Sequence, residues 1–143
     1  MKISSKEIES YCGKYSVPDS KILSDLIKNT WEFKNNPQMI SGALVGGLLQ
    51  LLIKISNAKN ILEIGMFTGY SALKMAESLS EEGSIHTCEL DKEHIKTAKI
   101  WINRSNFKDR ITIHEGRAIE TLNRFNSDFF DFCFVDADKI SYP

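Results

Sequence analysis

The sequence contains little cysteine, and its cysteines are not arranged as a site. Cys12, Cys88 and Cys133 are far apart, odd in number, and form no CxxC pair. Zinc sites and dithiol redox motifs usually require closely spaced cysteine pairs. The cysteine pattern therefore argues against both kinds of site.

An excess of charge of either sign is also missing. The 143 residues include 18 lysines and arginines and 19 aspartates and glutamates, which give a net charge of −1. Proteins that bind nucleic-acid backbones or anionic membrane surfaces usually carry a basic excess. We therefore expect a small-molecule partner, with no nucleic acid and no membrane as partner.

Long hydrophobic runs are absent as well. The longest apolar stretch, Gly42 to Ile55, is shorter than the roughly 20 residues that a membrane-spanning helix needs. The N-terminus lacks the basic-then-apolar pattern of a secretion signal. These absences predict a cytoplasmic protein.

The composition that remains is that of a globular domain. With 42% apolar and 26% charged residues, the chain can bury a core within one domain over residues 1–143. We expect N-terminal helices in residues 1–37 and a cofactor-binding α/β portion in residues 38–143. Apolar residues at helical spacing predict three early helices: Ser4–Tyr15, Pro18–Asn35 and Met39–Ser56.

After these helices the pattern alternates between strands and helices. Short runs rich in β-branched and aromatic residues predict four strands: Asn60–Ile64, Ser84–Cys88, Arg110–His114 and Phe129–Val135. The segments between them predict helices: Tyr70–Leu79, Lys92–Ser105 and Arg117–Phe125. Strict alternation favours a parallel sheet with right-handed crossovers.

The most informative segment is ILEIGMFTGYS, which starts at Ile61. It predicts an apolar strand, a turn containing Gly65 and Gly69, and the start of a helix. Glycine lets the backbone approach a ligand closely, and free N–H groups at a helix start can bind a phosphate or a carboxylate. Taken alone, the two glycines are explained equally well by a strand-to-helix turn without a ligand.

Two acidic residues favour a ligand that contains adenosine. Glu63 lies at the end of the first strand, and Glu89 ends the second, where a carboxylate can accept hydrogen bonds from both ribose hydroxyls. A dinucleotide site usually has GxGxxG, whereas this loop has ExGxxxG. The loop thus favours S-adenosylmethionine over a nicotinamide cofactor, although Glu89 alone does not separate the two.

Three stretches carry a family resemblance. ILEIGMFTGYSALKMAESLSEEGSIHTCELD, EGRAIETL and FVDADK resemble segments of the caffeoyl-CoA and catechol O-methyltransferase-like family. The resemblance implies a Rossmann-like class I methyltransferase fold, with helices on both faces of a parallel sheet in the order 3-2-1-4. Because family members continue through further strands, it also implies a chain truncated after the fourth strand, which would then be a sheet edge.

The resemblance also implies site residues. It assigns cofactor contacts to these positions: Ser41, Glu63, Gly65, Met66, Ser71, Glu89 and Ala118. Asp136 matches the first metal ligand of the family, and Lys139 matches a lysine proposed as general base. Oxygen ligands of this kind suit magnesium, calcium or manganese.

The resemblance predicts a metal-assisted O-methyltransferase that transfers a methyl group to a hydroxyl of a catechol-like or caffeoyl-CoA-like acceptor. A divalent cation would lower the pKa of that hydroxyl and orient it. Relatives of this kind are commonly homodimers, and we expect the same here. A non-catalytic module that binds the cofactor or a partner is the alternative, and a nicotinamide-dependent oxidoreductase is a third possibility.

Overall fold

The structure is a computed structural model and describes residues 5–137. Within these residues four helical elements come first: α1 (Lys6–Tyr15), α2 (Lys21–Phe33), the 3₁₀ helix η1 (Pro37–Met39) and α3 (Gly42–Ser56). Strands and helices then alternate: β1 (Asn60–Ile64), α4 (Tyr70–Ala76), β2 (Ser84–Glu89), α5 (Lys92–Arg104), β3 (Ile111–Glu115), α6 (Ala118–Leu122) and β4 (Phe132–Val135). The predicted alternation is confirmed.

The strands form one parallel sheet in the order β3-β2-β1-β4. Ile61 of β1 lies between Ile85 of β2 and Phe132 of β4. The predicted order is therefore confirmed, and β1 is an interior strand with a parallel neighbour on each side.

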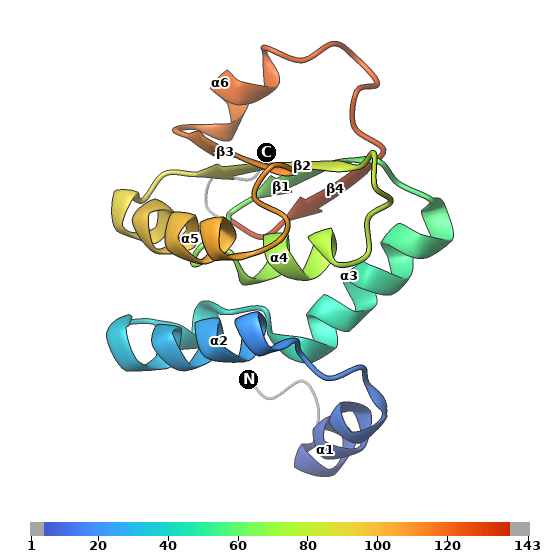
Figure 1. Ribbon diagram of the computed structural model, residues 1–143, viewed down its shortest axis with the longest axis vertical. Helices are drawn as coiled ribbons and strands as arrows, with labels where there is room; N and C mark the ends of the chain where they lie inside the picture. The colour runs from blue at the N-terminus through green and yellow to red at the C-terminus, as the bar shows by residue number, and fades with distance from the viewer. Residues whose placement is uncertain (1–4, 138–143) are drawn as a thin grey trace.

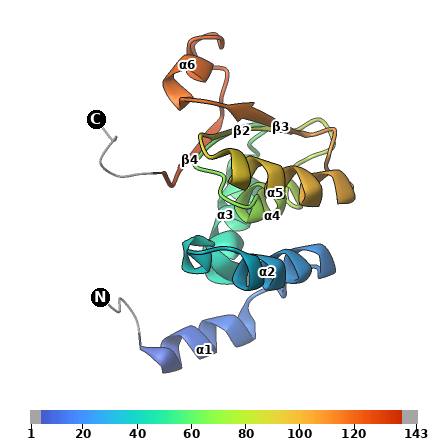
Figure 2. The ribbon, with the colours of Figure 1, turned by 90° about the vertical axis from the view of Figure 1, so that its left-hand side faces the viewer.

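Helices cover the two faces of the sheet unequally. The helices α4 and α5 lie on one face, and α6 lies on the other (Figure 1). The helix α2 forms a further layer outside α4 and α5, with α1 beyond it (Figure 2). The main core fills the space between the sheet and the larger helical layer, where these side chains are almost fully buried: Leu23, Leu26, Ile53, Ile61, Leu73, Met75, Ile85 and Ala98.

The fourth strand is shorter than predicted. It begins at Phe132, because Asp131 ends the preceding segment by accepting hydrogen bonds from the N–H groups of Lys59 and Asn60, both at 2.8 Å. The apolar residues Phe129 and Phe130, which suggested a longer strand, instead pack edge-on against the ring of His86. Their hydrophobicity therefore reflects an aromatic cluster on the α6 face of the sheet.

The helix α3 is more apolar and more exposed than a typical surface helix. By length and composition alone, the 20 residues Pro37–Ser56 could cross a membrane, contrary to the expectation from Gly42 to Ile55. Helices of soluble domains can have the same length and composition. One face of α3 packs on α4 through Gly46, Leu49 and Ile53. Its other face exposes these apolar side chains: Leu44, Val45, Leu48, Leu51, Leu52 and Ile55.

A buried ion pair joins the N-terminal helices to the sheet domain. Lys74 of α4 is 1% exposed and donates to Asp19 Oδ1 at 2.8 Å. The hydroxyl of Tyr70 donates to the same oxygen at 2.9 Å. Since Gly46 lies directly against the Lys74 side chain, a methyl group at position 46 would come within 2.7 Å of Lys74 Cγ. Lys74 is therefore enclosed by α3, α4 and the segment before α2.

We expect Asp19→Ala to lower the free energy of unfolding by about 3 kcal/mol or more, because it leaves a buried ammonium without its partner. Asp25→Ala is the matched control, since Asp25 pairs with Lys21 at the surface and its loss should cost less than about 0.5 kcal/mol. Urea denaturation measures both. Adding Lys74→Met to Asp19→Ala should recover stability. Equal losses in the two single variants would contradict this assignment.

Candidate functional site

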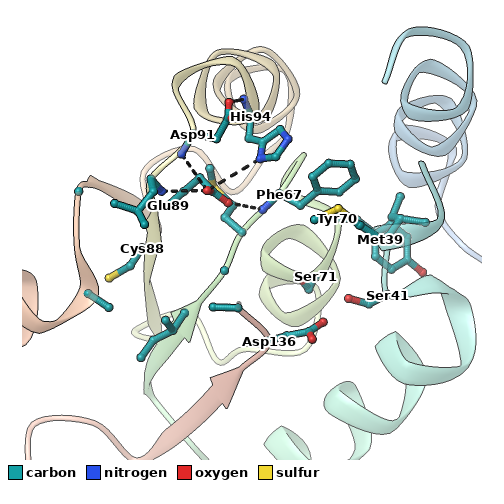
Figure 3. Close-up of a pocket in the computed structure, with 18 of the residues that line it drawn as sticks. Met39, Ser41, Phe67, Tyr70, Ser71, Cys88, Glu89, Asp91, His94 and Asp136 are labelled. Atoms are coloured by element: carbon teal, nitrogen blue, oxygen red, sulfur yellow. Dashed lines mark hydrogen bonds and ion pairs between the residues drawn. The ribbon is translucent and has the colours of Figure 1, made fainter. Parts of the chain in front are cut away.

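A cavity of about 740 Å³ opens at the carboxyl ends of the strands. Its wall combines η1, the start of α3, and the segments that follow all the described strands: Gln38, Met39, Ile40, Ser41, Ile64, Gly65, Met66, Phe67, Tyr70, Ser71, Cys88, Glu89, Leu90, Asp91, His94, Gly116, Ala118, Asp136 and Ala137. Figure 3 shows Glu89 and His94 at one end of the cavity, and Ser41, Ser71 and Asp136 toward the other. Open parallel sheets generally bind their ligands at this edge.

The loop between β1 and α4 needs its first glycine for two reasons. Gly65 has φ +93°, a conformation that side chains disfavour. A Cβ at this position would also overlap the carbonyl oxygen of Asp136 and lie 3.0 Å from Cα of Ala137. The absence of a side chain therefore lets the end of β4 pass directly against the loop, which brings Asp136 into the cavity wall.

Glu89 organises the cavity wall through hydrogen bonds to the backbone. Its Oε2 accepts from the N–H of Phe67 at 2.8 Å, and its Oε1 accepts from the N–H groups of Leu90 and Asp91 at 2.8 and 3.0 Å. A carboxylate offers about four acceptor positions, so roughly one remains in this geometry. Binding both hydroxyls of a ribose would thus require Oε1 to release one of its N–H donors.

Glu63 lies beneath the cavity wall and is fully buried. Burial raises the pKa of this carboxyl to about 7, and the hydroxyls of Ser71 and Thr87 partly oppose the shift. Thr87 donates to Oε2 at 2.5 Å, whereas Oε1 has no hydrogen-bond partner among the described residues. Because Glu63 does not line the cavity, its predicted role as a cofactor contact stays a prediction.

The remaining predicted cofactor residues are brought together from separate elements. Ser41 precedes α3, Met66 is in the loop, Ser71 is in the first turn of α4, and Ala118 begins α6. All four line the cavity. Their roles as cofactor contacts stay predictions, but residues far apart in the sequence share one cavity wall.

The predicted metal site is represented by a single residue. Asp136 follows β4 and lines the cavity, while Lys139, the predicted general base, lies outside residues 5–137. No group of three or more His, Cys, Asp or Glu side chains with the geometry of a metal site occurs in the part of the chain that the structure describes. Asp136 alone does not make a divalent-cation site.

Sequence reasoning missed several residues of the cavity wall. No residue pattern indicates His94, yet it lines the cavity with Nδ1 3.9 Å from Glu89 Oε1. The ring of Phe67 contacts His94 edge-on at a centroid distance of 4.7 Å. Their proximity depends on the left-handed backbone of Phe67, φ 52°, which no residue pattern indicated.

Comparison with known proteins identifies the family. The model of the O-methyltransferase family matches residues 13–143, nearly the whole chain. This chain belongs to that O-methyltransferase family. Its parallel sheet with helices on both faces is thus a Rossmann-like class I methyltransferase fold, as the sequence predicted.

Individual members of the O-methyltransferase family are similar over most of this chain. Caffeoyl-CoA O-methyltransferase 1 of Eucalyptus globulus is 39% identical over 108 residues, which are 73% of this chain and 44% of that protein. The O-methyltransferase of Bacillus cereus, solved in complex with S-adenosylhomocysteine, is 32% identical with a TM-score of 0.83, over 93% of this chain and 61% of that one. The O-methyltransferase TomG of Streptomyces achromogenes, solved with S-adenosylmethionine, is 30% identical with a TM-score of 0.83, over 93% of this chain and 60% of that one.

These comparisons also show a difference in length. The chain spans less than half of the Eucalyptus relative and about three fifths of each solved structure. Residues 13–143, which the family model matches, contain the cavity and the four strands around it. Functions that depend on the unmatched part of those relatives are therefore not attributed to this chain.

The raised pKa of Glu63 predicts that the free energy of unfolding depends on pH. Because its pKa is about 7 in the folded protein and near 4.5 when unfolded, the folded state binds the proton more tightly. Its contribution therefore makes the protein less stable as the pH rises from about 4.5 to 7, by an amount on the order of 3 kcal/mol at most. Glu63→Gln cannot ionise and keeps an acceptor for Thr87. Relative to wild type, this variant should gain stability between pH 5 and pH 8 in urea denaturation without ligand.

The comparison of the two proteins isolates Glu63, because their other titrating groups are the same. Parallel stability curves for wild type and Glu63→Gln from pH 5 to 8 would contradict the raised pKa of Glu63.

Proposed function

We propose that this chain forms the S-adenosylmethionine-binding part of an O-methyltransferase. Its acceptor would be a hydroxyl of a catechol-like or caffeoyl-CoA-like molecule. The observation that carries the proposal is the joint position of Glu89 and the Gly65 loop on one cavity wall at the carboxyl ends of β1 and β2. The cofactors in the Bacillus and Streptomyces relatives support the choice of ligand.

The described residues fit this cofactor chemically. Glu89 has about one free acceptor position for a ribose hydroxyl, and Ala118 offers an apolar surface that suits the adenine. The methionine part of the cofactor carries an ammonium and a carboxylate. The Ser71 hydroxyl at the start of α4, which lines the cavity, suits the carboxylate.

S-adenosylmethionine supplies a methyl group on a positively charged sulfur. In the proposed reaction an acceptor oxygen attacks this methyl in line, so that a C–O bond forms as the C–S bond breaks and the hydroxyl proton is lost. The residues described here would contribute by binding and orienting the cofactor, and the buried loop would exclude water from one side of it. Lys139 stays the proposed proton acceptor.

Metal assistance is a further element of this proposal. Asp136 would supply one oxygen ligand to magnesium, calcium or manganese. The other ligands are not provided by residues 5–137, so the steps given above do not pass through a metal. A homodimer and a cytoplasmic location also belong to the proposal. The exposed apolar face of α3 supports the homodimer.

The second candidate function rests on what the cavity contains. The described residues that line it fit the cofactor, whereas residues 5–137 hold no group of side chains that could bind the metal. The chain would then be a non-catalytic cofactor-binding module. Methylation of a catechol in the presence of S-adenosylmethionine and Mg²⁺ separates the two functions, since only the enzyme forms a methyl ether.

Calorimetric titration of the 143-residue chain with S-adenosylhomocysteine tests the shared part of both proposals. We expect saturable binding by wild type and a dissociation constant at least about tenfold higher for Glu89→Ala, which loses acceptors for the ligand and for the loop. Glu82→Ala is the control, because Glu82 is an exposed acid paired with Lys59 away from the cavity. It should bind as wild type does.

NADH serves as the competing ligand in the same titration. Tighter binding of NADH than of S-adenosylhomocysteine would instead favour the hypothesis of a nicotinamide-dependent oxidoreductase. A chain with native circular dichroism that binds neither ligand would overturn the proposed cofactor site.

A further inference from the structure

The loop that forms part of the cavity wall is also held from its far side. Thr68 lies in this loop but does not line the cavity, and its side chain points into the protein, where it is 0% exposed. Thr30 of α2, also 0% exposed, donates a hydrogen bond from its hydroxyl to Thr68 Oγ1 at 3.0 Å. A residue of the N-terminal helical layer therefore contacts the loop between β1 and α4 through a fully buried hydrogen bond.

The loop conformation requires such support. Phe67 has φ 52°, a left-handed conformation that residues with a side chain disfavour. Its N–H is held by Glu89 from β2, and the next residue, Thr68, is held by Thr30 from α2. Two side chains from opposite sides thus fix consecutive residues of the strained segment.

The helix α2 is placed firmly enough to serve as this support. Leu23 and Leu26 on its inner face are fully buried in the main core. Near its C-terminal end, Lys34 donates to the carbonyl oxygen of Glu93 on α5 at 3.2 Å. No residue of α2 lines the cavity. Thr30 therefore acts on a ligand only indirectly, and its hydrogen bond to Thr68 joins it to the loop.

We propose that Thr30 is a positioning residue for cofactor binding, which holds the loop at Met66 and Phe67 in its binding conformation through Thr68. This inference rests on the proposed function, since it requires that the cavity bind S-adenosylmethionine or its product. It assigns to an N-terminal helix a role in the cofactor site that the sequence did not indicate.

The test is calorimetric titration with S-adenosylhomocysteine of Thr30→Val, which keeps the shape of the side chain but removes its hydroxyl. Loss of a buried hydrogen bond that fixes the loop should raise the dissociation constant about tenfold. Thr30→Ser restores the hydroxyl and should return it to within about twofold of wild type. Titrations are made well below the melting temperature of each variant, so that lower stability alone does not change the result.

Thr97→Val is the matched control, because Thr97 donates to the carbonyl oxygen of Glu93 on the exposed side of α5. It should bind as wild type does. Thr68→Val removes the same hydrogen bond from the other partner, so it replaces Thr30→Val if that variant does not fold. The double variant Thr30→Val/Thr68→Val should be no weaker than the weaker single variant, because both act on one bond.

The outcomes separate this inference from the proposed function. If wild type binds and Thr30→Val or Thr68→Val binds equally well, the positioning role is wrong while the cofactor site stands. If Thr30→Ser is as weak as Thr30→Val, the effect comes from packing and the hydrogen-bond role is wrong. If folded wild type does not bind S-adenosylhomocysteine, both the cofactor site and the positioning role fail.

Discussion

The cavity depends on the close approach of two backbone segments at Gly65. The N–H of Gly65 donates to the carbonyl oxygen of Cys88 in β2. The N–H of Asp136 donates to the carbonyl oxygen of Ile64, the residue that precedes Gly65. Three parallel strands thus converge on one residue without a side chain. Any larger residue would force the end of β4 away and separate Asp136 from the loop. The pairing of the strands is therefore by itself a reason for glycine at this position.

Much of the fold follows from the sequence because its hydrophobic pattern is strong where strands are buried on both sides. The run from Ile61 to Ile64 and its partner around Ile85 were predicted within one residue of their observed bounds. The start of the fourth strand was harder to predict, because the consecutive apolar residues Phe129 and Phe130 fit a strand and an aromatic cluster equally well. Only Asp131, through its bonds to the start of β1, decides between them.

The cavity wall was predictable where residue type and strand end coincide. Glu89 ends a strand, Gly65 and Asp136 each follow one, and parallel strand ends meet at one edge. The use of Glu89 as an acceptor for backbone N–H groups could not be predicted, because it depends on the turn after β2. His94 and Thr30 were missed for a related reason. Each acts through a tertiary contact that leaves no spacing in the sequence.

The sheet order has a consequence for how the chain folds. The first strand pairs with β2 after one helix, but its other side stays bare until α5, α6 and the intervening segments have been made and β4 arrives. During synthesis from the N-terminus, an apolar interior strand is thus left half-paired while residues 90–131 are made. Such unpaired edges are where nascent chains associate wrongly. The wall around Gly65 is accordingly completed only when β4 pairs with β1, after the other described strands have been made.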